Sequence, residues 1–352
     1  IAEDVERLKA VSFRDKISSM YDKMARTKVI AALLADQFGL TADEKADLDR
    51  AASIYKFDLV TSMVGEFPEL QGIMGEHYAR LAGEKPAVAQ AIAEHYEPIA
   101  ADGALPQSLV GTVLAIADKL DSLMSFFAVD LIPSGSNDPY ALRRQAYGIV
   151  RMIAEHDWPF ALASLQPTIA KALAEADQTN GLDFAAHQQE LNDFMIDRAK
   201  QLLQGQKIRH DIVDAVTVRS DADIAGILAA AKLLTQHAAD SDFKPVMEAL
   251  GRVLRITGKQ TVTTAVDPTK FENPTEGQLH DAVTTTAKTF AAEPTEADYQ
   301  ALKALAKPID AYFDATMVMA DDKTVRENRL ATLQQLAKLI RQFGDVSQVI
   351  VK

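Results

Sequence analysis

Apolar residues recur at intervals of three and four along nearly the whole chain, which is the spacing of an amphipathic helix. In residues 21–37, Met24, Ile30 and Leu34 fall near one face of such a helix. Residues 86–99, 108–125, 142–153, 160–218, 244–257 and 322–343 follow the same rule. The sequence has no strand-rich region and no repeat with a period of about 20–50 residues. The pattern predicts an all-α protein.

One helix is predicted to begin just after Thr41, because Thr41 and Glu44 form a capping-box pattern. Its apolar positions are Leu48, Ala52, Tyr55, Leu59 and Met63, so the helix should run to residue 63. Asp58 lies beside this apolar stripe, and we expect its carboxylate to be at least partly buried. A buried carboxylate needs partners, or else it takes up a proton.

The segment after Asp58 changes abruptly in composition. Residues 65–75 contain Gly65, Glu66, Pro68, Glu69, Gly72 and Gly75. Glycine and proline at this density predict a loop. Two questions follow: whether Asp58 belongs to a metal site, and what the rest of the protein uses this loop for.

Other breaks divide the chain into groups of helices. Residues 133–139 are rich in proline, glycine and asparagine and separate two predicted helices. Ser220 and Asp223 form a capping pattern for a later helix. Residues 257–277 form a threonine- and lysine-containing loop that is too long for a simple connector. Pro308 should kink or interrupt the long helix in which it lies.

Composition narrows the class of protein. At 352 residues the chain is long enough for two or three domains, and its 48% apolar content is typical of globular proteins. No segment approaches the roughly 20 uninterrupted apolar residues that span a bilayer. The first residues are acidic and lack a methionine, as in a fragment, and do not form a secretory signal. The chain has no cysteine, so we expect a cytoplasmic protein without disulfides or membrane segments.

The formal net charge of −13 argues against a basic coat over the whole chain, so contact with RNA would have to come from local basic patches. Two groups of cations occur in the last third of the chain, which also contains the loop at 257–277. They are Arg252, Arg255 and Lys259, and Lys323, Arg326 and Arg329. Such groups are common on solvated helix faces, and cations at a helix N-terminus oppose the helix dipole. The spacing of these cations is compatible with either a solvated helix face or a contact with RNA.

Two aspartates resemble part of the metal framework of the HD superfamily of phosphohydrolases, in which a histidine, a His-Asp pair and a later aspartate bind metal. The run AASIYKFDLVT places Asp58 at the aspartate of the pair but Phe57 at its histidine. The run AIADKLD places Asp118 at the final aspartate. The upstream histidine should lie near MARTKV, where Ala25 and Arg26 stand. Because both imidazoles are absent, the resemblance implies a degenerate site without metal.

A working metal-dependent phosphohydrolase is the rival hypothesis. Its ligands would be Asp58, Asp118, His77 and His95. The alternative for the two histidines is a structural role beside the loop. The dipeptides His156–Asp157 and His210–Asp211 lie outside the framework, so we take neither as a ligand pair.

A more specific resemblance, to the β subunits of bacterial heterotetrameric glycyl-tRNA synthetases, rests on six motifs in the family's order. They are KFDLVTSMVGEFPELQGIMGEHYA, GEKPAVAQAIAEHYEP, LAIADKLDSL, PSGSNDPYALRRQAYGIVRMI, RHDIVDAV and MVMADDKTVRENRLATL. They correspond to the C-terminal half of such a subunit. The resemblance implies a linker remnant at 1–20, a degenerate HD-like helical domain at 21–160, a helical connector at 161–221 and a DALR-type anticodon-binding domain at 222–352.

The resemblance also implies a set of tRNA-binding residues. Gly251 and Arg255 depart from the family's basic motif around Arg252, whereas the last helix keeps its R.NRL pattern. The candidate contacts are Arg143, Arg144, Arg252, Arg255, Lys259, Lys323, Arg326, Asn328 and Arg329.

The family's activity implies a role for this half. The α subunit activates glycine, and the β subunit supplies most of the tRNA binding. This half is therefore expected to grip glycine tRNA on its anticodon side, for aminoacylation by the α subunit in a heterotetramer of two α and two β subunits. It should be non-catalytic and hold no cofactor, since ATP and magnesium serve the complete enzyme. A third possibility is that the HD-like domain is only a scaffold.

Overall fold

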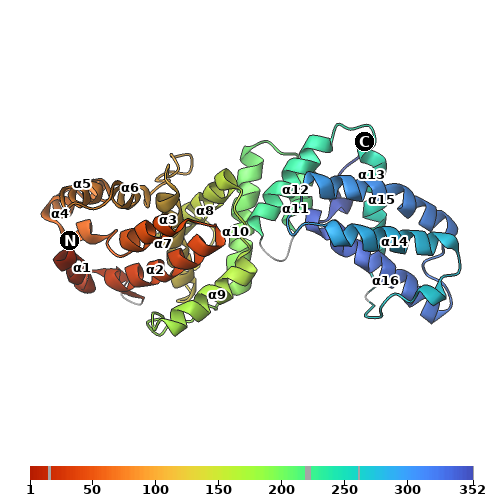
Figure 1. Ribbon diagram of the computed structural model, residues 1–352, viewed down its shortest axis with the longest axis horizontal. Coiled ribbons are helices and arrows are strands. Elements are labelled where there is room, and N and C mark those ends of the chain that lie inside the picture. The colour runs from red at the N-terminus through yellow and green to blue at the C-terminus, as the bar shows by residue number, and fades with distance from the viewer. Residues whose placement is uncertain (15–16, 219–222, 261, 352) are drawn as a thin grey trace. The chain divides into compact units, whose positions relative to one another are not determined.

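The computed structural model describes residues 1–14, 17–218, 223–260 and 262–351 (Figure 1). Over these residues it contains 16 α-helices and one two-stranded hairpin, which confirms the mostly helical prediction. The helices are α1 Ala2–Arg7, α2 Met20–Gln37, α3 Ala42–Ala52, α4 Ser62–Glu66, α5 Ile73–Leu81, α6 Pro86–Glu94, α7 Leu109–Phe127, α8 Leu142–His156, α9 Leu162–Glu175, α10 Gln188–Gly205, α11 His210–Thr217, α12 Ile224–His237, α13 Phe243–Thr257, α14 Pro274–Thr289, α15 Glu296–Ala315 and α16 Lys323–Ile340. The strands β1 Ser12–Arg14 and β2 Ser18–Ser19 pair antiparallel, and the sequence did not predict them.

The described residues divide into two compact units. The first comprises residues 1–198 with Asp223 and Ile224, and the second comprises residues 199–218 and 225–351. The division therefore falls at residue 198, within α10, whereas the sequence placed boundaries at 160 and 221. The extents of the HD-like and anticodon-binding domains stay predictions.

Helix α7 forms the centre of the first unit. Every residue from Val110 to Phe127 is buried, and α2, α3, α6 and α8 all pack against the helix. A helix that is enclosed on all sides is normally apolar all round. This one nevertheless carries Asp118, Lys119 and Asp121 into the interior, so these side chains need polar partners from the helices around them.

The helix predicted for residues 42–63 ends early. Its capping box between Thr41 and Glu44 is confirmed, but α3 ends at Ala52. A 3₁₀ helix at Phe57–Val60 and the short α4 follow. The prediction was wrong beyond Ala52, where the regular apolar spacing gives way to five consecutive buried side chains, residues 54–58.

Residues 1–20, predicted to be a linker remnant, carry secondary structure over their described part. They contain α1 and the hairpin, and the side chain of Leu8 is fully buried. Ser19 and Asp22 form a capping box at the start of α2. The segment is therefore part of the first unit's packed structure.

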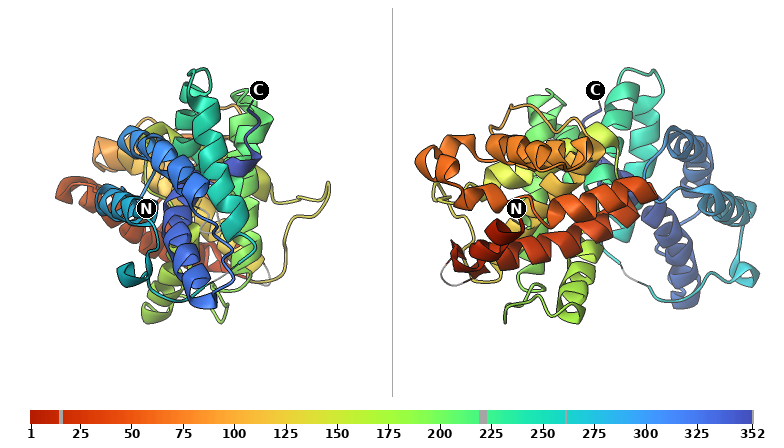
Figure 2. Two further views of the ribbon diagram at one scale, coloured as in Figure 1. Left: turned by 90° about the vertical axis from the view of Figure 1, so that its right-hand side faces the viewer. Right: turned by 60° about the vertical axis from the view of Figure 1, so that its left-hand side comes forward.

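The second unit contains α11 to α16. Helix α13 packs against α15 and α16, and α14 packs against the same two helices (Figure 2, left). Pro308 lies inside α15, which continues through it, and Thr295 caps that helix as a capping box with Asp298. Ser220, predicted to cap a helix with Asp223, lies outside the described residues. No helix in the described part of the chain is long and apolar enough to cross a membrane.

Candidate nucleic-acid interface and buried charge cluster

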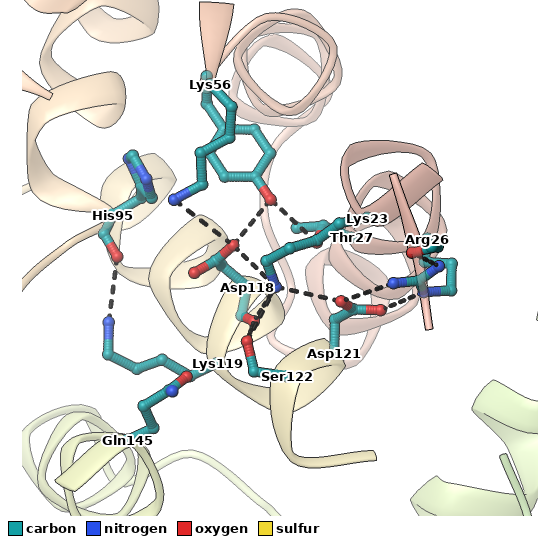
Figure 3. A network of polar contacts seen from close by, with 12 residues as sticks. Lys23, Arg26, Thr27, Lys56, His95, Asp118, Lys119, Asp121, Ser122 and Gln145 are labelled. Carbon is teal, nitrogen blue, oxygen red and sulfur yellow. Dashed lines mark hydrogen bonds and ion pairs between the residues drawn. The ribbon is translucent and has the colours of Figure 1, made fainter. Parts of the chain in front are cut away.

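The first unit contains a cluster of charged side chains in its interior (Figure 3). We call it the buried charge cluster; it comprises Lys23, Arg26, Lys56, Asp118, Lys119 and Asp121, all buried. The Lys23 Nζ atom lies 3.1 Å from Asp121 Oδ2 and 3.2 Å from Asp118 Oδ1. The Arg26 Nε atom donates to Asp121 Oδ1 at 2.7 Å. Helix α2 thus supplies the cations that neutralise the carboxylates of α7.

The cluster keeps the carboxylate of Asp118 ionised. Burial alone would raise the pKa of Asp118, but the ammonium groups of Lys23 and Lys56 outweigh it and hold that pKa well below its ordinary value. The Tyr55 hydroxyl also donates to Asp118 Oδ1, at 2.8 Å. Burial lowers the pKa of Lys119 to about 8, although Asp118 opposes the shift. Lysine cations thus lie where the sequence suggested a vestigial metal site.

The rival set of metal ligands is not brought together. Burial lowers the pKa of His95 well below its ordinary value, so its ring is neutral, and its Nδ1 atom lies 2.5 Å from the carbonyl oxygen of Ile92. His77 is exposed on α5. Within residues 1–14, 17–218, 223–260 and 262–351, no three His, Asp or Glu side chains are placed to hold a metal ion. The geometry gives the phosphohydrolase hypothesis no support.

Asp58 has a different role from Asp118. Its carboxylate is fully buried, and its Oδ2 atom accepts hydrogen bonds from the backbone N–H groups of Gly72 at 2.7 Å and Gly75 at 3.1 Å. These amides belong to the start of α5, so Asp58 caps a helix from a distant point in the chain. Burial raises the pKa of Asp58, while the Gly72 amide and the Lys56 ammonium act in the opposite direction.

The glycines of the loop make this cap possible. Gly72 has φ of +80°, and a Cβ atom there would lie 2.7 Å from the ring of Tyr96. A Cβ atom on Gly75 would lie 2.9 Å from Asp58 Oδ2. The sequence shows the glycines but not their partner, and their position after a buried aspartate is the signal that could have revealed it.

One group of predicted tRNA contacts is exposed in the second unit. Arg252, Arg255 and Lys259, which we call the α13 basic face, are all exposed. Lys259 lies just beyond the end of α13 at Thr257. The guanidinium of Arg252 lies 4.1 Å from the ring centre of Phe313. None of the three forms an ion pair with a carboxylate of the described residues, so their charges are free to meet a ligand.

Arg329, also predicted to contact tRNA, is buried. Its Nη2 atom lies 2.7 Å from Glu272 Oε2 and 3.0 Å from Glu276 Oε1, and its Nη1 atom donates to the carbonyl oxygen of Met317 at 3.0 Å. These bonds tie α16 to the start of α14 and to the loop that precedes α16. Arg329 is therefore held by internal contacts, and its contact with tRNA stays a prediction.

Asn328 is also buried by internal contacts. It is 3% exposed and exchanges two hydrogen bonds with the backbone of Asp267, at 2.7 and 3.0 Å. Arg326 is half-buried and donates to the carbonyl oxygen of Ala320 at 2.7 Å. Lys323 alone among the candidates of α16 is exposed, 3.7 Å from Glu327.

The remaining candidates, Arg143 and Arg144, lie in the first turn of α8. Asp138 caps this helix, because its carboxylate accepts the N–H groups of Leu142 at 2.8 Å and Arg143 at 3.0 Å. Arg143 is half-buried and Arg144 is exposed. Neither guanidinium forms an ion pair with a described carboxylate.

Comparison with known proteins places the sequence in a family. Residues 1–218 match the model of the glycyl-tRNA synthetase beta subunit. The whole chain is 83% identical to the glycine–tRNA ligase beta subunit of Lacticaseibacillus casei and 55% identical to that of Limosilactobacillus fermentum. Each alignment covers 51% of the relative, so the chain spans about half the length of the curated relatives it matches. Since the family model matches well over half of the sequence, the chain belongs to the glycyl-tRNA synthetase β-subunit family.

Proposed function

We propose that this half of a β subunit binds glycine tRNA, with the second unit on the anticodon side. The observation that carries the proposal is the α13 basic face, three exposed cations without ion pairs on a chain whose formal charge is −13. Cations on an acidic surface are usually neutralised by neighbouring carboxylates. A set that is left free suits a ligand that brings its own negative charge.

The chemistry of the α13 basic face fits RNA. Arginine presents a planar fork of donors that matches phosphate oxygens and guanine edges. The ring of Phe313 holds the Arg252 guanidinium in one orientation while its N–H groups stay free. Such ordering before binding lowers the entropy lost on association. Unpaired anticodon bases offer edges that this arrangement can contact.

The rest of the assembly follows from the family. We infer that aminoacylation takes place on the α subunit of a heterotetramer, with ATP and magnesium bound outside this half and no residue described above as catalytic. The HD-like domain would then serve as a structural body whose vestigial site is filled by lysines. The protein would work in the cytoplasm, where tRNA is charged.

The double substitution Arg252→Ala with Arg255→Ala tests the proposal in the complete enzyme. We expect the affinity for glycine tRNA, measured by fluorescence anisotropy, to fall by about tenfold or more, because each lost contact costs on the order of 1 kcal/mol. Lys303→Ala is the matched control: it removes a cation of the same unit that Asp242 already pairs at 2.6 Å. Unchanged affinity in a folded double variant would overturn the proposal.

A further inference from the structure

A second group of arginines lies in the first unit, and two of them rest on aromatic rings. Arg14, in β1, lies 4.7 Å from the ring centre of Tyr140. Arg198, in α10, lies 5.4 Å from the ring centre of Phe194. Stacking of this kind fixes the plane of a guanidinium and leaves its edge free to donate hydrogen bonds.

The two rings belong to one aromatic ledge at the end of α7. Phe126 contacts Tyr140 with ring centres 4.4 Å apart, and Phe127 contacts Phe194 with ring centres 5.5 Å apart. Because Phe126 and Phe127 are consecutive residues of a fully enclosed helix, their positions are rigid. The arginines that rest on Tyr140 and Phe194 are therefore held on one support although they come from opposite ends of the first unit's sequence.

Two further arginines follow the ledge directly. Arg143 and Arg144 begin α8, three and four residues after Tyr140. The nearby carboxylate of Asp138 is committed to the amides of that helix, at 2.8 and 3.0 Å. We call Arg14, Arg143, Arg144 and Arg198 the ledge arginines. None of them forms an ion pair with a carboxylate of the described residues.

One of the ledge arginines, Arg198, keeps an unsatisfied donor. Its Nε atom is buried and has no hydrogen-bond partner in the described structure. Burial lowers the pKa of Arg198 and the positive charge of Arg143 lowers it further, although the carboxylates of Asp197 and Asp138 oppose the shift. A buried donor without an acceptor costs free energy, as does a pair of like charges. An anionic ligand would remove both costs.

We propose that the ledge arginines bind the phosphodiester backbone of RNA. The proposal rests on the proposed function and adds a second contact to it, in the first unit. Two of the arginines rest on separate rings, and the four come from three elements, β1, α8 and α10, which suits successive phosphates of a strand. Contacts to phosphate position a nucleic acid without reading its sequence. The site should therefore hold the body of the tRNA, whatever its anticodon.

The test uses the complete enzyme with Arg143→Ala and Arg198→Ala combined, and tRNA affinity measured from 50 to 200 mM KCl. Each phosphate contact contributes roughly 0.7–0.9 to the slope of log affinity against log salt. We expect the slope to fall by about one to two and the affinity at low salt to fall by about tenfold. Glycine tRNA and a non-cognate tRNA should lose the same factor. Arg198→Lys should keep part of the affinity, since it keeps the charge.

Arg80→Ala is the matched control, because Arg80 is an exposed arginine of the same unit that is already paired with Glu76, at 2.6 Å. Thermal melting of each variant verifies the fold. Suppose that the variant with Arg143→Ala and Arg198→Ala keeps the salt slope and the tRNA affinity of the unchanged enzyme while the variant with Arg252→Ala and Arg255→Ala loses tRNA binding. In that case the inference about the ledge arginines is overturned and the proposed function stands. If neither variant changes binding, both are overturned.

Inorganic phosphate at matched ionic strength distinguishes a small-anion site from an RNA site. A rise in melting temperature with phosphate that disappears in the Arg143 and Arg198 variant, together with an unchanged salt slope for tRNA, would mean that the cluster binds free phosphate. That outcome would also overturn the inference.

Discussion

The carboxylate of Asp58 accepts the backbone N–H of Gly72 at 2.7 Å, across 14 residues of sequence. The contact turns an aspartate that resembles a metal ligand into the cap of α5. It also explains why a glycine follows at that distance, since the positive φ of Gly72 and the nearby ring of Tyr96 leave no room for a side chain. The loop and the buried carboxylate form one structural unit.

Gly72→Ala should destabilise the first unit by more than about 2 kcal/mol, because it adds strain at positive φ and a contact with the Tyr96 ring. Gly65→Ala is the control from the same loop. A Cβ atom there meets nothing within 4 Å, so we expect a change within about 1 kcal/mol in either direction. Urea unfolding of both variants measures the difference. Equal free energies of unfolding would show that the Asp58 cap is not constrained as described.

Asp121→Asn should destabilise the protein by roughly 3–5 kcal/mol, since Lys23 and Arg26 would lose their shared buried counter-ion. Asp102→Asn, an exposed aspartate of the same unit, serves as the control and should change stability by less than about 0.5 kcal/mol. Thermal and urea unfolding measure the change in the free energy of unfolding for each of the two variants. A small effect at Asp121 would mean that the buried charge cluster contributes little to stability.

Arg329→Ala should cost about 3–5 kcal/mol of stability, because it leaves Glu276, 2% exposed, buried without its counter-ion. Arg252→Ala, at an exposed position, should change stability by less than about 0.5 kcal/mol. Arg329→Ala is therefore expected to change the free energy of unfolding, whereas Arg252→Ala is expected to change the affinity for tRNA. Should Arg329→Ala leave the free energy of unfolding intact, its assignment as an internal clamp is wrong.

His237 should titrate above its ordinary pKa of 6.5. Burial lowers this pKa, but hydrogen bonds to Glu296 at 3.0 Å and Asp240 at 2.7 Å outweigh burial. The ring also stacks on Tyr299, with centres 4.0 Å apart. Because the folded pKa is raised, the stabilisation is fully present below the unfolded pKa and is lost as pH rises through the folded pKa.

NMR titration of the histidine ring protons measures this pKa, with His237→Gln assigning the resonance. Glu296→Gln should move the midpoint to lower pH, since one of the two carboxylates is neutralised. A midpoint for His237 at or below 6.5 would contradict the assignment.

Local sequence was a good guide wherever the hydrogen bonds are local. The capping box at Thr41 joins residues three positions apart, so the side-chain pattern alone located a helix start. The apolar spacing likewise located most helices, because the period of 3.6 residues is a property of the helix itself. Six ordered motifs were enough to indicate the family.

The candidate site could be predicted only in part. The α13 basic face could be read from the spacing of Arg252, Arg255 and Lys259, and the structure leaves these side chains exposed. Arg329 has the same residue type and a stronger family motif, yet it is buried. Exposure is set by what packs over a helix, and the residues that cover Arg329 lie 53 and 57 positions away.

The sequence by itself determined the helical class, several helix starts and the family. Only the tertiary structure decided what the buried charges do. Lys23 meets Asp121 across 98 residues, and the ledge joins Arg14 to Arg198 through rings from two helices and a loop. A charge buried in a low dielectric must find its partner wherever the fold brings one. That partner is fixed by the packing of whole helices, which no local pattern of residues specifies.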